Sequence, residues 1–160
     1  GERLLRVREH VENEPMFMAN YADTLTDAPL PDMIERFRAS GAVASMIVVP
    51  SSSTHHVVEM DEEGRVRHLG AVRELLQWEN GGYFIMTPEI FKVLREGEEM
   101  VPTGLSRLIP EGKLIAQRYQ GFFRAADTFK DRAELEAMYH RGERPWMVWE
   151  RDRRQSPGAA

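Results

Sequence analysis

Cysteine is absent from the 160-residue chain. This absence excludes disulfide bonds and thiolate zinc sites, and it favours a reducing compartment. Long hydrophobic runs are also missing: no apolar stretch approaches the roughly 20 residues of a membrane-spanning helix, and no signal peptide is visible. We therefore expect a cytoplasmic protein without a membrane partner.

Positively charged residues are fewer than negatively charged ones. The chain has 21 Lys and Arg against 26 Asp and Glu, which gives a net charge of −5. Such a balance is unfavourable for binding nucleic acid, so we expect no nucleic-acid partner. With 42% hydrophobic residues the chain can bury a core. We expect one domain over residues 1–150, followed by a flexible polar tail over 151–160.

Helical and β patterns alternate in the first third of the chain, which predicts an α/β fold with a mostly parallel sheet flanked by helices. A hairpin pattern with the turn "DEEG" predicts an antiparallel insertion in the middle. The pattern after it predicts that "GFFRAA" extends the preceding strand or pairs with it. Helices are predicted over 2–11, 28–41, 87–99 and 131–142, a short helix within 104–119, and strands over 16–23, 42–50, 81–86 and the end of 104–119.

Two aspartates follow predicted strands. Asp23 ends the apolar segment "MFMANYAD", and Asp127 follows "GFFRAA". Ligands of such sheets bind at the carboxyl ends of the strands, and Mg²⁺ prefers one or two carboxylates completed by phosphate oxygens and water. Asp23 is equally explained as a turn residue. Thr128 and Asp131 form a capping box for the last helix, which leaves Asp127 without a structural explanation.

The stretch "ENGGYF" is unusual because two glycines enter a predicted strand. Paired glycines there indicate a bulge, or a close approach by a ligand or backbone. Asn80 offers an amide donor and acceptor that suit sugar hydroxyls. The competing interpretation is an Asn-Gly hairpin turn.

Several segments together resemble the sugar-nucleotide pyrophosphorylases, most closely the glucose-1-phosphate cytidylyltransferases. They are "YADTLTD" (21–27), "NGGYFI" (80–85), "EGEE" with Pro102, and the block at 111–150 that ends "PWMVWE". The resemblance covers nearly the whole chain in order, and it implies a Rossmann-like nucleotide-diphospho-sugar transferase fold. Residues 1–150 would then be the C-terminal portion of a catalytic domain.

The resemblance implies roles for individual residues. Asp23 and Asp127 match the two catalytic aspartates that bind Mg²⁺. Arg3 in "GERL" matches the arginine of a T-G-G-R-L segment beside the nucleotide, so Arg3 and Asp23 would contact the NTP. Asn80 would contact the hexose, with Gly81 allowing its close approach. The implied reaction joins a sugar 1-phosphate to an NTP, with CTP favoured, in nucleotide-sugar synthesis for polysaccharides, and the implied assembly is a homo-oligomer.

The chain departs from the family pattern in two places. No segment matches the family's G-x-G-T-R loop followed by P-K, so the N-terminal βαβ part is expected to be missing and the chain alone to show little or no turnover. The lysine of the family's E-K-P segment is also absent from "HLGAVRELLQWENGG", where Arg73 is the substitute candidate. This second departure leaves open an alternative function, a non-catalytic binding or regulatory module, or a scaffold with a vestigial cleft.

Overall fold

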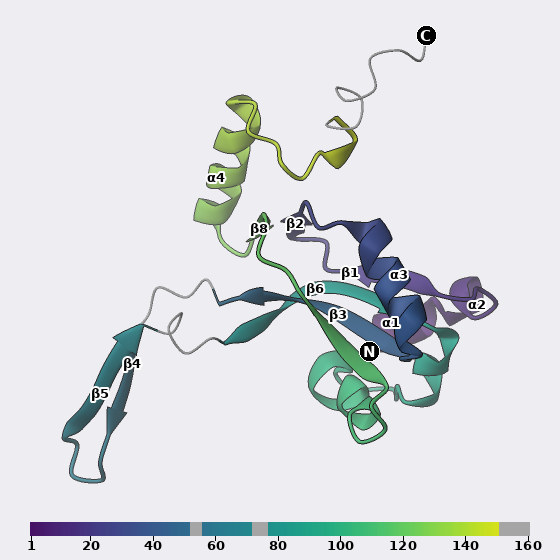
Figure 1. Cartoon of the computed structure of the whole chain (residues 1–160), viewed down its shortest axis with the longest axis horizontal. Coiled ribbons are helices and arrows are strands. Elements are labelled where there is room, and N and C mark those ends of the chain that lie inside the picture. The colour runs from purple at the N-terminus through teal and green to yellow at the C-terminus, as the bar shows by residue number, and fades with distance from the viewer. Residues whose placement is uncertain (52–55, 72–76, 151–160) are drawn as a thin grey trace.

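A computed structural model describes residues 1–51, 56–71 and 77–150. Arg73 and the expected tail 151–160 lie outside these ranges. The central element is a four-stranded sheet with the order β1-β6-β3-β7 (Figure 1). Its strands are β1 (Phe17–Asn20), β6 (Trp78–Met86), β3 (Ala44–Pro50) and β7 (Leu114–Arg118).

Three of these strands run in the same direction. β6 is antiparallel to both of its neighbours, β1 and β3, and β3 is parallel to β7. The expected α/β class with a mostly parallel sheet is therefore confirmed, with β6 as the reversed strand. β3 has the continuous β-branched sequence of a strand that is covered on both faces, and all but two of its residues are buried.

The core lies on both faces of this sheet because successive residues of a strand point to opposite sides. Phe84 and Met86 of β6 pack on one face with Ile90 and Leu105, whereas Ile85 packs on the other. That second face is covered by helix α3 (Leu30–Ser40), which contributes Met33 and Phe37. Gly41 ends α3 in the left-handed conformation, as its position predicts.

The helix predicted over residues 2–11 forms as two short helices, α1 (Glu2–Arg6) and α2 (Arg8–Val11), which are separated at Val7. The helix predicted over 87–99 was wrong beyond its first turn. The chain there forms a 3₁₀ turn, η2 (Pro88–Lys92), and Thr87 makes no side-chain cap. A π-helical turn, η3 (Met100–Gly104), and a second 3₁₀ turn, η4 (Leu105–Leu108), follow. Ile90, Leu105 and Leu108 of these turns are buried in the core, so packing rather than helical periodicity set their conformation.

The strand predicted over 16–23 ends at Asn20 instead, and a separate strand β2 (Thr24–Thr26) follows a turn. β2 pairs antiparallel with β8 (Phe123–Ala125), so the predicted pairing of "GFFRAA" with β7 was wrong. Thr26 Oγ1 strengthens this ribbon by donating to the carbonyl of Phe122 at 2.8 Å. Helix α4 (Phe129–His140) continues from β8, and Gly142 follows it with a φ of 79°.

The expected hairpin insertion is confirmed as β4 (His56–Met60) and β5 (Val66–Ala71). Figure 1 shows this ribbon extending away from the four-stranded sheet. The cross-strand pair Val58 and Leu69 is exposed, as are Met60 and Val66, which also pair. One face of the ribbon is therefore apolar and uncovered within the described part of the chain.

Candidate functional site

A cleft of about 1000 Å³ opens beside strand β1. Three segments form its walls: the N-terminal residues 1–4 with Val7, the end of β1 with the turn after it (19–23), and the loop 97–102, which leads into η3. Phe84 of the central sheet also lines the cleft. Segments far apart in sequence therefore meet around one cavity, which is the arrangement of most small-molecule sites.

Two of the residues predicted to contact a nucleotide lie in this cleft. Arg3 and Asp23 both line it, Arg3 from α1 and Asp23 from the turn between β1 and β2. Both residues are exposed. Asp23 therefore lies in a turn and also lines the cleft, so the structural interpretation and the site interpretation of this residue do not exclude each other.

The pairing of β2 with β8 brings Asp127 near Asp23. The backbone carbonyl of Asp23 accepts a hydrogen bond of 2.8 Å from the N–H of Ala126, the residue before Asp127. Because the strands are antiparallel, the beginning of β2 and the end of β8 share one end of the ribbon. Asp127 is exposed but does not line the cleft itself.

The capping box predicted for α4 is present, and it does not use Asp127. The N–H of Asp131 donates to Thr128 Oγ1 at 3.2 Å, and the N–H of Thr128 donates to Asp131 Oδ2 at 2.9 Å. The hydroxyl of Thr128 also donates to that carboxylate, and these bonds hold the pKa of Asp131 below its ordinary value. Thr128 and Asp131 are therefore sufficient to begin the helix, and within the described residues the Asp127 carboxylate has no partner.

The Asn80–Gly82 segment forms a bulge in β6 rather than a hairpin turn. Met46 pairs with Phe84 and Val48 with Asn80, so residues 81–83 of β6 lie opposite Ile47 alone. Asn80 Oδ1 accepts from the N–H of Gly82 at 3.0 Å, which stabilises the bulge locally.

Both glycines of the bulge are required by close packing. A Cβ on Gly81 would lie 2.6 Å from Cγ2 of Ile47, and Gly81 is buried. Gly82 has a φ of 72°, and a Cβ there would lie 2.5 Å from the Tyr21 ring. The close approach expected at this segment is thus made by side chains of the chain itself.

Tyr21 is a cleft residue that the sequence analysis did not single out. It lines the cleft next to Asp23, and its hydroxyl accepts a 3.4 Å contact from the Asn80 amide. Its ring packs edge-on against Phe84 at 5.7 Å between centroids. Tyr21 therefore connects Asn80, the residue predicted to contact the sugar, to the cleft wall. Its place within "YADTLTD" was the available signal.

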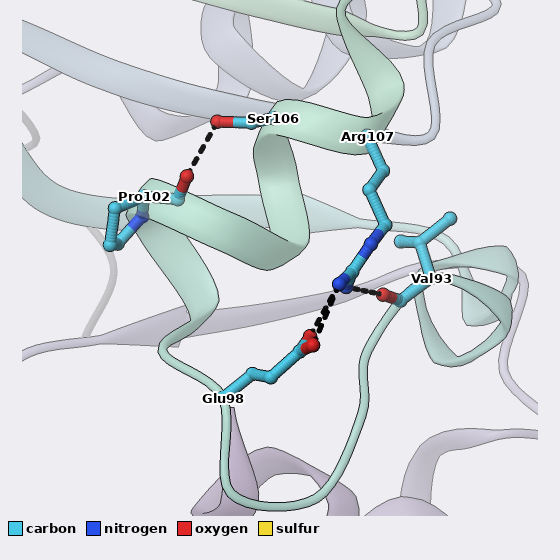
Figure 2. Close-up of polar contacts among 5 residues, drawn as sticks. All are labelled: Val93, Glu98, Pro102, Ser106 and Arg107. Carbon is cyan, nitrogen blue, oxygen red and sulfur yellow. Dashed lines mark hydrogen bonds and ion pairs between the residues drawn. The ribbon is translucent and has the colours of Figure 1, made fainter.

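The loop 97–102 is held in place by a side chain from η4 (Figure 2). Arg107 Nη1 donates to the carbonyl of Val93 at 2.7 Å, and Nη2 lies 2.8 and 2.6 Å from the two carboxylate oxygens of Glu98. Ser106 Oγ adds a 2.8 Å hydrogen bond to the carbonyl of Pro102. These contacts fix the wall of the cleft that faces Arg3.

The cleft is predominantly acidic. Its charged lining residues are Glu2, Arg3, Asp23, Glu98 and Glu99. The described residues contain no cluster of three or more His, Asp or Glu side chains arranged to hold a metal ion. A divalent cation here would therefore depend on one or two carboxylates, with the remaining ligands from phosphate and water, which is the donor set that Mg²⁺ accepts.

No known protein-family profile matches the chain. Among individual proteins, the glucose-1-phosphate cytidylyltransferase of Salmonella typhi is 27% identical over 158 residues, covering 94% of this chain and 59% of that protein. The chain is similar to glucose-1-phosphate cytidylyltransferases. A Bacillus subtilis protein assigned the same activity is 28% identical over 149 residues, covering 92% of this chain and 58% of its own length.

These cytidylyltransferases confirm the resemblance that the sequence motifs indicated. The chain spans less than two thirds of their length, 58 to 59%. The similarity therefore extends over a shared region and not over the whole length of these enzymes.

Solved structures confirm the fold. A protein assigned as a glucose-1-phosphate thymidylyltransferase from Bacillus anthracis, crystallised with sucrose, superposes with a TM-score of 0.62 at 11% identity, covering 86% of this chain and 59% of that one. HddC from Yersinia pseudotuberculosis gives a TM-score of 0.54 at 14% identity, covering 81% of this chain and 57% of that one.

In the described part of the chain, every helix is too short or too polar to cross a membrane.

Proposed function

We propose that the chain is part of a nucleotidyltransferase that joins a sugar 1-phosphate to an NTP, with CTP favoured, giving an NDP-sugar and pyrophosphate. Similarity to glucose-1-phosphate cytidylyltransferases supports the reaction class. The observation that carries the site is the β2–β8 pairing, in which Ala126, the residue before Asp127, donates its N–H to the carbonyl of Asp23, a residue that lines the cleft together with Arg3.

The residues present fit a magnesium ion. Asp23 and Asp127 are exposed carboxylates at one end of the same ribbon, and the described residues provide neither with a hydrogen-bond or ion-pair partner. We assign both to Mg²⁺, which when bound would offset phosphate charge during transfer. The acidic lining of the cleft supports this assignment, because a bare polyphosphate would be repelled there.

The other residues would bind and orient the substrates. Arg3 is an exposed guanidinium on the cleft wall and would pair with a phosphate of the nucleotide. Asn80 and Gly81 would lie on the sugar side, with the Asn80 amide held beside Tyr21. Because Gly81 is buried against Ile47, its contribution would be the shape of the bulge that presents Asn80.

The proposed transfer needs no covalent protein nucleophile. An oxygen of the sugar 1-phosphate attacks the α-phosphorus of the NTP, and the bond from that phosphorus to the bridging oxygen breaks as pyrophosphate leaves. Positioning the two phosphates in line and compensating their charge account for most catalysis of this kind. The absence of cysteine is consistent with such a mechanism.

The first test is binding of Mg²⁺ with CTP, and of Mg²⁺ with glucose 1-phosphate, by calorimetry on the 160-residue protein. Asp23→Asn and Asp127→Asn are expected to weaken magnesium-dependent binding, whereas Glu35→Gln, on the exposed side of α3, should not. Absence of binding by the folded wild-type protein, for every NTP and sugar phosphate offered, would count decisively against the proposal.

The second test is turnover, measured as pyrophosphate release. The chain covers 59% of its cytidylyltransferase relatives, and we expect little or no release from it alone. Joining it to the upstream region of a relative is expected to give release that requires Asp23 and Asp127. Release that is unaffected by either substitution would contradict the assigned metal site.

A second candidate function is a sugar-phosphate or nucleotide-binding module without chemistry. It is favoured by one observation: the segment before Asn80 lacks the lysine expected from the family pattern. This module would bind the same ligands and retain the Asp23 dependence, but it would release no pyrophosphate in any pairing of NTP and sugar 1-phosphate.

We further propose a homo-oligomer in the cytoplasm. Sedimentation velocity on the purified chain tests the oligomer directly, and a monomer over the full accessible concentration range would contradict it.

A further inference from the structure

We propose that Arg107 is a positioning residue for the cleft, which fixes the loop 97–102 and withdraws the negative charge of Glu98 from bound phosphate. This inference rests on the proposed function, since it concerns the same cleft. It concerns residues outside the metal and nucleotide positions assigned above.

Arg107 belongs to η4 and forms an ion pair with Glu98. Its side chain is 28% exposed and that of Glu98 is 30% exposed, so both are partly removed from solvent. Arg107 does not line the cleft, whereas Glu98 does. Arg107 reaches the loop from behind and holds Glu98 and the Val93 carbonyl together (Figure 2). The Arg107 guanidinium therefore connects Val93 and Glu98, the two ends of the segment that leads into the cleft wall.

The loop 97–102 also contacts the N-terminal segment that carries Arg3. The backbone of Gly1 packs so tightly on Glu98 that a Cβ there would lie 2.5 Å from the Glu98 carbonyl oxygen. Gly1 is two residues before Arg3, the predicted nucleotide contact, and both line the cleft with Glu98. A displacement of the loop at Glu98 would therefore disturb the segment that carries Arg3.

The side chains that line the cleft carry an excess of negative charge. Carboxylates outnumber the single guanidinium among the residues that line the cleft. The Arg107 ion pair neutralises one of these carboxylates, Glu98, from outside the cavity. An unpaired carboxylate within about 10 Å of a bound phosphate, at an effective dielectric constant of about 20 to 40, weakens binding by roughly 5- to 15-fold for each unit of phosphate charge.

The experiment compares the affinities of four proteins for magnesium CTP and for glucose 1-phosphate with magnesium. They are the wild type, Arg107→Met, the double variant Glu98→Gln with Arg107→Met, and Arg95→Met. Arg95 is exposed on the same segment and provides a matched control for the loss of one positive charge.

We expect Arg107→Met to bind magnesium CTP at least roughly 5- to 15-fold more weakly than the wild type, since the complex carries more than one net negative charge. The double variant should return to within about threefold of wild-type affinity, because it removes the exposed charge; the remaining deficit reflects the loss of the contacts by which Arg107 fixes the loop. Arg95→Met should bind as the wild type does. Rescue by the double variant distinguishes a charge effect from a general loss of structure, since a purely structural role of Arg107 would leave both variants equally weak.

Three outcomes would overturn the inference. Wild-type affinity in Arg107→Met would show that the ion pair does not affect the cleft, while the proposed function would stand. Equal weakness of Arg107→Met and the double variant would assign Arg107 a structural role alone. Absence of ligand binding by the wild type would reject the proposed function and this inference together. Should Arg107→Met fail to fold, Glu98→Gln alone decides: tighter binding than wild type, as expected once Arg107 is left unpaired, supports the charge argument, and unchanged or weaker binding refutes it.

Discussion

The substitution Gly82→Ala tests the packing of the bulge against the cleft. Gly82 has a φ of 72°, a conformation that residues with a Cβ adopt only with strain. The added Cβ would lie 2.5 Å from Cδ2 and 2.9 Å from Cγ of Tyr21. Alanine must therefore both remain strained and displace a side chain that lines the cleft.

The two costs can be assigned magnitudes. The left-handed conformation costs an L-residue about 1–2 kcal/mol. Displacing the Tyr21 ring disrupts its edge-on contact with Phe84, at 5.7 Å between centroids, which is worth about 0.5–1.5 kcal/mol. Tyr21 is 43% exposed and has room to move, so no larger collision energy is expected. The total destabilisation should be about 1.5–3.5 kcal/mol.

The control is Gly41→Ala at the end of α3. Gly41 has a φ of 63°, and a Cβ there would meet nothing within 4 Å, so only the backbone strain remains. We expect it to cost about 1–2 kcal/mol. Urea denaturation followed by circular dichroism gives the free energy of unfolding for both variants. Gly82→Ala in a Tyr21→Ala background should cost no more than the control.

Equal destabilisation by Gly82→Ala and Gly41→Ala, in the presence of Tyr21, would refute the reasoning, because it would show that the ring contact has no energetic consequence. Gly82→Ala could also cost over about 2 kcal/mol more than Gly41→Ala in the Tyr21→Ala background. That excess would have to come from a contact of Gly82 with a residue other than Tyr21.

Four further predictions concern stability. Thr128→Ala should destabilise the chain by about 0.5–2 kcal/mol through loss of the α4 cap, as measured by urea denaturation. The lowered pKa of Asp131 means that its stabilising contribution is complete above the ordinary aspartate pKa and is lost as the pH falls through its folded value, so the stability difference between wild type and Asp131→Asn should shrink in acid. Tyr119→Phe should cost about 1–2 kcal/mol because it removes the hydroxyl that donates to the Asp27 carboxylate; unchanged stability would show that this bond is not formed in solution. Ile90→Ala should cost about 2–5 kcal/mol because Ile90 is fully buried, and a cost below 1 kcal/mol would contradict the described core.

The sequence predicted the elements whose patterns are local. The β-branched run of β3, the amphipathic helix α3 with Gly41 at its end, and the hairpin with its "DEEG" turn all form as expected. The capping box was predicted from Thr128 and Asp131 alone. In each case the signal depends on residues within one or two turns of one another, so no knowledge of the remaining chain was needed.

Sequence reasoning failed where distant segments decide the conformation. Residues 93–99 were predicted to be helical, but the chain there turns so that Glu98 meets Arg107, and the core residue Leu94 packs with Leu105. Tyr21 was not recognised as part of the cleft wall, and Arg107 was not recognised as the residue that holds that wall from outside the cleft. Their importance depends on contacts with Glu98 and Gly82, and neither contact is visible as a periodic pattern.

The sequence by itself determined which segments form helices and strands at the centre of the fold, which family the chain resembles, and which aspartates to consider. The tertiary structure decided that β8 pairs with β2, and thereby that Asp127 approaches Asp23 across a separation of about a hundred residues. It also decided that a bulge, and not a turn, presents Asn80. The physical reason is that propensity and capping act over a few residues, whereas strand pairing and cleft formation depend on which surfaces are buried together once the whole chain has folded.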